Sequence, residues 1–160
     1  MRRTAPLLAL AWLALVGAAS PQVLPLTATT VTGQTIRVNQ DQRAVVVVHF
    51  WATWCLPCRV EMPMLNAISR KYGKENVLVI GIALDAGANR QKIAAAGAGV
   101  GFPLARLSET NVRRRDVPAA LPETLVYGRD GRLRYRFGAG GTTLNAATLD
   151  RVLPPLVAER

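Results

Sequence analysis

Two cysteines lie three positions apart in the segment WATWCLPCR, residues 51–59, and the chain has no others. The segment follows directly on the apolar run VVVVHF, residues 45–50, which predicts a buried strand leading into a helix. Backbone amides at a helix N-terminus carry partial positive charge, and this favours the thiolate form of a cysteine. Cys55 and Cys58 therefore form a candidate redox centre.

A purely structural disulfide is the alternative interpretation of this pair. In the chain-entropy relation a closed loop of four residues contributes roughly 2 kcal/mol, against ~3 kcal/mol for fifteen residues. Small domains that depend on disulfides are rich in cysteine, whereas this chain has two cysteines in 160 residues. The redox interpretation is favoured, and the stability of the fold has to come from its core.

The strand and helix that hold the cysteines belong to a predicted α/β domain. Residues 77–84 form a second continuous apolar run, so strand, helix and strand make a right-handed crossover with parallel strands. The cysteines then lie at the carboxyl end of a strand, where open α/β sheets place their chemistry. The buried face of the helix is predicted from its apolar spacing to contain Val60, Met64, Ala67, Ile68 and Tyr72.

Shorter elements flank this crossover. Residues 27–38 predict a hairpin around Gly33, and residues 125–137 predict a second hairpin across positions 129–131. Asn145 is the predicted N-cap of a last helix, which Pro154 and Pro155 are expected to interrupt.

The first nineteen residues have the composition of a secretory signal. A charged start at Arg2 and Arg3 precedes an apolar stretch and a small-residue end at Ala19. The apolar span 5–19 is shorter than the ~20 residues of a membrane helix, so cleavage is favoured over membrane anchoring through residues 5–19. We expect a signal peptide or N-terminal anchor at 1–19 and one exported domain at 20–160.

The charge balance limits the class of partner. Without its first nineteen residues the chain has 18 basic and 10 acidic side chains, a net charge of +8. Export argues against nucleic acid, and a basic exported surface suits anionic lipid headgroups or an acidic protein face. The basic run 113–115 is explained by a solvated helix face.

Two motifs resemble one protein family. The segment WATWCLPCRVEMP, residues 51–63, is similar to the active-site segment of exported thioredoxin-like proteins of the TlpA, ResA and CcmG type. The segment LPETLVY, residues 121–127, followed by Asp130-Gly131, resembles that family's cis-proline strand and hairpin. The resemblance spans residues 23–157 and implies a thioredoxin-like fold, with a central mixed β-sheet flanked by helices.

The resemblance also implies roles for the residues around the cysteines. Cys55 would be the exposed attacking thiol and Cys58 the buried resolving thiol, since a mixed disulfide needs a second thiol to release the product. Pro57 keeps the turn rigid, and Leu56 adds no charge. Strongly oxidising exported relatives have a histidine in this dipeptide, so its absence here predicts a reductant.

Glu61 and His49 are the candidate proton carriers. Glu61 matches the acidic residue that the family places beneath its active site, where a raised pKa would let it exchange the proton of Cys58. An exposed glutamate in a helix's first turn is the alternative. His49 occupies the position at which ordinary thioredoxins have a buried aspartate. A core histidine with one hydrogen bond is favoured there over a proton relay.

Pro122 is the expected cis-proline opposite the cysteines. It would expose the backbone of Leu121 to a substrate segment in extended form. Glu123 either tunes which partner docks or is an exposed strand residue. Trp51 and Trp54 are expected to shape the rim and floor of the site, although packing alone would explain both.

The leading hypothesis is a thiol-disulfide oxidoreductase outside the cytoplasm, in the periplasm or on the outer face of the membrane. It would reduce specific protein disulfides, such as those of apocytochrome c or a copper-site protein, with electrons from a membrane thiol-disulfide donor. It would use no cofactor beyond the Cys55–Cys58 pair. The alternatives are a disulfide oxidant or isomerase and a Cu(I) metallochaperone that binds through the cysteines and Met62 or Met64. Met64 is expected to point into the core, which argues against copper.

Overall fold

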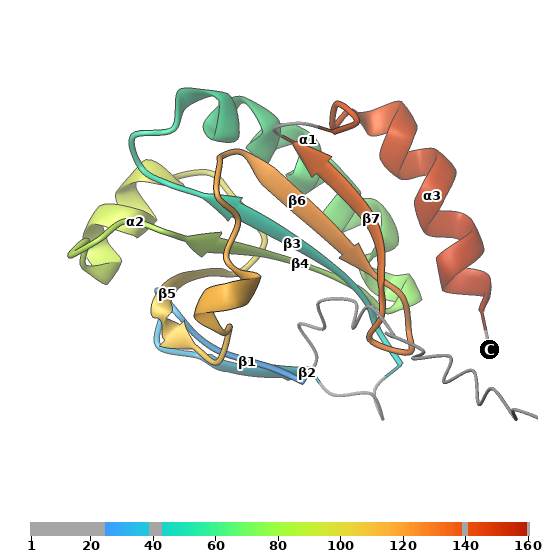
Figure 1. Ribbon diagram of the computed structural model, residues 1–160, viewed down its shortest axis with the longest axis horizontal. Helices are drawn as coiled ribbons and strands as arrows, with labels where there is room; N and C mark the ends of the chain where they lie inside the picture. Colours follow the sequence, from blue (N-terminus) through green and yellow to red (C-terminus); the bar gives the residue numbers. More distant parts are fainter. Residues whose placement is uncertain (1–24, 39–42, 139–140, 160) are drawn as a thin grey trace, which may run out of the picture.

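A single mixed sheet forms the centre of the molecule (Figure 1). The computed structural model describes residues 25–38, 43–138 and 141–159. Seven strands lie in the order β2-β1-β5-β4-β3-β6-β7. The strands are β1 (Leu26–Thr30), β2 (Thr35–Val38), β3 (Val45–Trp51), β4 (Val77–Ala83), β5 (Leu104–Thr110), β6 (Glu123–Tyr127) and β7 (Leu133–Gly138). The helices are α1 (Leu56–Tyr72), α2 (Arg90–Ala96) and α3 (Ala146–Ala158), with short 3₁₀ turns η2 (Gly73–Glu75) and η3 (Arg114–Asp116).

Strand β3 lies in the interior of the sheet, between β4 and β6. All seven of its residues are buried, and it pairs in parallel with β4 and antiparallel with β6. Its side chains alternate between two cores, so Val45, Val47 and Trp51 join the core that contains residues of α1, α2 and α3. Val46, Val48 and Phe50 join the core on the other face. The predicted crossover of strand, helix and parallel strand is confirmed.

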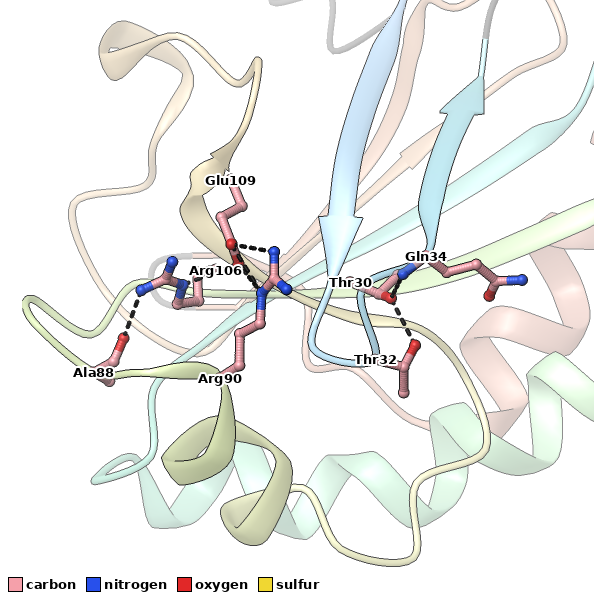
Figure 2. A network of polar contacts seen from close by, with 7 residues as sticks. All are labelled: Thr30, Thr32, Gln34, Ala88, Arg90, Arg106 and Glu109. Atoms are coloured by element: carbon pink, nitrogen blue, oxygen red, sulfur yellow. Dashed lines mark hydrogen bonds and ion pairs between the residues drawn. The ribbon is translucent and has the colours of Figure 1, made fainter.

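The N-terminal hairpin is also confirmed. Strands β1 and β2 pair antiparallel, and Gly33 has a φ of 84° in the turn between them. The Thr30 hydroxyl bonds that of Thr32 at 2.8 Å and accepts from the Gln34 amide at 3.1 Å, which closes the turn (Figure 2). The hairpin extends the sheet beyond β5, through antiparallel pairing of β1 with β5.

The buried face of α1 differs from the predicted one. Val60 is 70% exposed, and Met64 is only partly buried. Cys58 is fixed in the core at the start of the helix, so the turns of the helix bring a different set of side chains inward. The buried residues of α1 are Cys58, Met62, Leu65, Ile68 and Tyr72.

The C-terminal helix α3 has the predicted N-cap but continues through its prolines. Asn145 and Thr148 form a reciprocal capping box. The expected interruption at Pro154 and Pro155 is wrong, because apolar side chains on both sides of the prolines are buried and hold the helix against the sheet.

The predicted signal or anchor at 1–19 lies outside the described residues. Within the part of the chain that the structure describes, no helix has the length and apolar character needed to cross a membrane.

Candidate active site

The two cysteines lie where β3 passes into α1. Cys55 is the N-cap of α1, and its sulfur accepts a hydrogen bond from the Cys58 backbone amide at 3.3 Å. The two residues form a disulfide with Cα atoms 5.4 Å apart. Cys55 is buried, with 4% of its surface exposed, and is not the exposed thiol that the resemblance implied for this disulfide-bonded state; Cys58 has no exposed area. The pair therefore has an outer and an inner sulfur, at a helix N-terminus that stabilises a thiolate.

The loop that carries Cys55 is attached to the neighbouring parallel strand. Asp85, which follows β4, accepts from the Thr53 backbone amide at 2.9 Å and from the Thr53 hydroxyl at 2.5 Å. The Leu84 amide bonds the Trp51 carbonyl at 2.9 Å and joins the same two chain segments. Sequence analysis did not identify Asp85. Its position could have indicated a role, because Asp85 follows a predicted strand whose carboxyl end lies at the same sheet edge as the cysteines.

Exposed apolar side chains precede and follow Cys55 in the chain. Trp54 is 73% exposed and Leu56 is 61% exposed, on either side of Cys55. Val60 lies one turn further along α1 and is also exposed. Trp51, in contrast, is completely buried. Exposed apolar groups gathered at one position are typical of a surface that contacts other proteins.

The segment before β6 reaches the same sheet edge. The Leu121–Pro122 peptide bond is cis, and Leu121 packs against both cores. The next residue, Glu123, pairs with Phe50 near the carboxyl end of β3. Gly138, with a φ of 136°, lies behind this segment, and a Cβ there would overlap the Pro122 carbonyl oxygen.

Glu123 is buried and is not the exposed strand residue that was one of its two expected states. Its carboxylate forms an ion pair with Arg136 of β7. Burial raises its pKa, and the Arg136 charge acts in the opposite direction. By the alternation of β6, Glu123 lies on the same face as Leu125, whereas Thr124 lies on the face covered by α1. A role for Glu123 in partner docking stays a prediction.

His49 and Glu61, which the sequence offered as separate candidates, lie close together. His49 Nδ1 is 3.8 Å from Glu61 Oε2 and 2.9 Å from Thr124 Oγ1. Burial lowers the pKa of His49 to about 4, and a hydrogen bond with the backbone of Cys58 acts in the other direction. Burial raises the pKa of Glu61 to about 7. A neutral ring and a carboxyl group that titrates near neutrality therefore lie beside the inner cysteine.

The position of the methionines bears on the copper alternative. Met62 is the methionine in the core, and Met64 is only partly buried. From the sequence Met64 was expected to point into the core, and no position was predicted for Met62. Among the described residues, no group of three or more His, Cys, Asp or Glu side chains is arranged to hold a metal ion. The copper alternative stays a prediction.

Comparison with known proteins gives the family. The model of the AhpC/TSA family matches residues 17–136, three quarters of the chain. The chain belongs to the AhpC/TSA family. Curated relatives include the thiol-disulfide oxidoreductase ResA of Bacillus cereus, 28% identical over 105 residues, which cover 66% of this chain and 61% of ResA. A thioredoxin of Coprinus comatus is 42% identical over 41 residues, 26% of this chain and 39% of that protein. The chain thus spans less than two thirds of the length of these relatives.

Solved structures show the same fold as this AhpC/TSA family member. A putative thiol:disulfide interchange protein DsbE from Chlorobium tepidum has a TM-score of 0.69 at 20% identity, over 87% of this chain and 97% of its own. A secreted Mycobacterium tuberculosis disulfide oxidoreductase has a TM-score of 0.60 at 21% identity, over 82% and 93%. The predicted thioredoxin-like fold and the predicted resemblance to ResA-type proteins are confirmed.

Proposed function

We propose that the protein is a thiol-disulfide oxidoreductase that reduces specific protein disulfides outside the cytoplasm. The observation that carries the proposal is the Cys55–Cys58 disulfide at the N-terminus of α1. The apolar surface around Cys55 and the cis Leu121–Pro122 segment support it, since both can receive an extended substrate. The name of the ResA relative, a thiol-disulfide oxidoreductase, agrees with this chemistry.

The reaction begins from the reduced dithiol. The Cys55 thiolate attacks one sulfur of the substrate disulfide, and the electron pair of that bond leaves on the other substrate sulfur, which takes up a proton. Cys58 then attacks Cys55, so the Cys55–Cys58 bond forms as the bond to the substrate breaks. The substrate gains two electrons and two protons, and the protein is left as the disulfide.

Glu61 supplies the proton step on the inner side. Cys58 becomes a nucleophile only when it loses its proton, and an ionised Glu61 carboxylate can accept it. A pKa of about 7 means that Glu61 is partly ionised at neutral pH and can later release the proton. Glu61 thus acts as a general base during substrate reduction and as a general acid when the disulfide is reduced again.

The redox direction, the location, the electron donor and the clients are proposed as follows. Leu56 and Pro57 add no cation beside Cys55, so the thiolate gains no stabilisation from the dipeptide and the protein is a reductant. The exported location follows from residues 1–19, and a membrane thiol-disulfide donor would return the electrons. Apocytochrome c cysteines and copper-site cysteines are the two client classes proposed. The basic chain suits an acidic surface on either one.

The deciding experiment is the equilibrium reduction potential of the Cys55–Cys58 pair, measured at pH 7 against glutathione and dithiothreitol. A value near or below about −270 mV supports the reductase, and a value near −120 mV makes the protein an oxidant. The absence of a reversible Cys55–Cys58 disulfide would contradict both the reductase and the oxidant.

Trapping variants separate the two sulfurs. A Cys58→Ser variant should accumulate a mixed disulfide with a protein substrate through Cys55, because the resolving thiol is missing. The matched Cys55→Ser variant should accumulate none. Equal trapping by both variants contradicts the proposed order of attack.

A further inference from the structure

A groove with a volume of about 380 Å³ lies beside α1, and the disulfide chemistry above does not use it. One wall is the side of α1 that carries Arg59 and Arg70. The other wall is the end of α2 and the turn after it, residues 96–100. The groove begins next to the redox site, because Arg59 directly follows Cys58 and its amide bonds the Cys55 carbonyl at 3.3 Å.

The two walls of the groove are bonded to each other. The loop after α2 has the sequence GAGVG, residues 97–101. Asn66 of α1 accepts from the Gly101 amide at 2.8 Å and donates to the Gly99 carbonyl at 3.4 Å. Gly99 has a φ of 84°, and a Cβ on Gly101 would lie 2.8 Å from Asn66 Oδ1, so both positions favour glycine. The groove is thus formed before a partner arrives, which lowers the entropic cost of binding.

Two arginines give the groove its charge. Arg59 and Arg70 are exposed, and neither guanidinium has an ion pair or hydrogen bond within the described part of the chain. Lys71, in contrast, is bound by Asp150 at 2.7 Å. The lining contains no acidic side chain among the described residues. Guanidinium groups without a partner favour carboxylates, which they bind through two parallel hydrogen bonds.

The spacing of the arginines determines which partner fits. Arg59 and Arg70 lie about three turns apart on α1, which is about 16 Å along the helix axis. In an extended segment, residues four positions apart point to the same side and lie about 13 Å apart, a difference that long arginine side chains can cover. The residue midway between them also points to that side. It would contact the apolar groups of Met62, Pro63 and Val100, which line the groove.

We propose that this groove binds an extended acidic segment of the substrate protein. One carboxylate contacts Arg59, a second contacts Arg70, and an apolar side chain lies between them, so the segment has the pattern acidic-x-apolar-x-acidic. The identification of the partner as the disulfide substrate rests on the proposed function, whereas binding of the segment needs no thiol chemistry. The groove thereby selects among protein disulfides by the sequence that lies near their cysteines.

Fluorescence anisotropy with a labelled, cysteine-free peptide tests the binding. The peptide has Asp at two positions four apart and Leu midway, and a comparison peptide has Asn in place of both Asp residues. With the oxidised protein at low ionic strength, we expect the Asp peptide to bind about tenfold more tightly, and the difference to shrink in about 0.5 M salt. Equal affinities overturn the proposal, and so does binding of phosphatidylglycerol vesicles in place of the peptide.

Matched variants test whether the peptide lies in the groove. Arg59→Gln and Arg70→Gln should each weaken binding of the Asp peptide about threefold, whereas Arg37→Gln removes the same charge from β2 and should have no effect. Ala98→Glu adds a negative charge inside the groove and should also weaken binding. Ala95→Glu adds it outside the groove and should not. An equal loss in Arg37→Gln and Arg70→Gln would mean that net charge alone attracts the peptide, and would overturn the proposal.

Substrate kinetics test the link to the reaction. Two peptides, each with an internal disulfide beside the Asp or the Asn pattern, are compared by kcat/KM. The wild type should prefer the Asp peptide about tenfold, and the ratio should fall to near one in the Arg59→Gln/Arg70→Gln double variant. Arg37→Gln should keep the wild-type ratio. An unchanged ratio in the double variant overturns the proposal.

The outcomes distinguish this inference from the proposed function. If the disulfide does not exchange with thiols but the Asp peptide binds through the two arginines, the proposed function fails and the groove remains a binding site for acidic segments. If exchange is normal and peptide binding does not depend on Arg59 and Arg70, this inference alone fails.

Discussion

His49 and Glu61 affect folding stability in opposite directions. Burial gives His49 a pKa of about 4 against its ordinary 6.5, and gives Glu61 a pKa of about 7 against its ordinary 4.5. Between pH 4.5 and 6.5 the unfolded chain therefore holds a proton on His49 and none on Glu61, and the folded chain holds the reverse. Both states bind one proton, so the two contributions to pH dependence cancel.

Single substitutions should reveal the hidden pH dependence. In Glu61→Gln, His49 acts alone, and the free energy of unfolding should fall as pH is lowered from 6.5 towards 4. In His49→Asn, Glu61 acts alone, and the free energy of unfolding should rise as pH is lowered from 7 towards 4.5. Each slope can reach about 1.4 kcal/mol per pH unit. Urea unfolding of the oxidised proteins across this range measures both.

The exposed Glu75→Gln variant is the control, and its curve should run parallel to that of the wild type. Parallel curves for all four proteins would mean that the two pKa shifts are absent from the molecule.

At the scale of elements, the two faces of α1 are expected to have different roles: the inner face supports stability, and the outer face is proposed to contact the substrate. Leu65 is fully buried on the inner face, and Val60 is exposed beside the cysteines. Leu65→Ala should lower the free energy of unfolding by about 2–5 kcal/mol, because it leaves a cavity in the core. Val60→Ala should change it by less than about 0.5 kcal/mol. Urea unfolding of the two variants tests the assignment.

Substrate kinetics complete this comparison. Loss of an apolar contact worth about 1 kcal/mol should raise the KM of Val60→Ala for a protein disulfide about fivefold. Its KM for a small disulfide should stay unchanged, since a small molecule does not reach Val60. Equal effects on both substrates would exclude Val60 from partner docking.

The sequence predicted the elements whose signals are local. The apolar run 45–50, the turn at Gly33 and the cap at Asn145 each depend on neighbouring residues, and all are present. The face of α1 was missed because Val60 resembles a core residue in type, and only the fixed position of Cys58 sets the rotation of the helix.

The parts of the site that sequence reasoning missed depend on distant contacts. Asp85 binds Thr53 from the next parallel strand, and Thr124 reaches His49 from β6. The meeting of His49 with Glu61 likewise depends on how α1 lies on β3. Local spacing places Asp85 at the sheet edge of the cysteines, but residue type and spacing do not determine which side chains meet there.

At the scale of the whole molecule, an ion-pair network ties α2 to the sheet (Figure 2). Arg90 of α2 and Arg106 of β5 both bind the Glu109 carboxylate, at 2.6 Å and 2.9 Å. Arg106 also donates to the Ala88 carbonyl before α2. The bonds from Arg106 and then Arg90 lower the pKa of Glu109 to about 2.

Glu109→Gln should weaken this attachment. A lowered carboxyl pKa contributes stability that is present above 4.5 and is lost as pH falls towards 2. We expect the variant to lose about 1 kcal/mol at pH 7, because the network is partly exposed and screened. The difference from the wild type should disappear near pH 2. A difference that persists at that pH would show that packing, and not charge, accounts for the loss.

Gly138 makes the site vulnerable at a position without a reactive atom. It lies at the end of the edge strand β7, where a single methyl group would collide with the Pro122 carbonyl and push the cis segment from its place. Substitutions at Gly138 would thus be selected against as strongly as substitutions at Cys55, although the reaction makes or breaks no bond of this glycine. A mutational scan scored by activity would rank this glycine beside the cysteines.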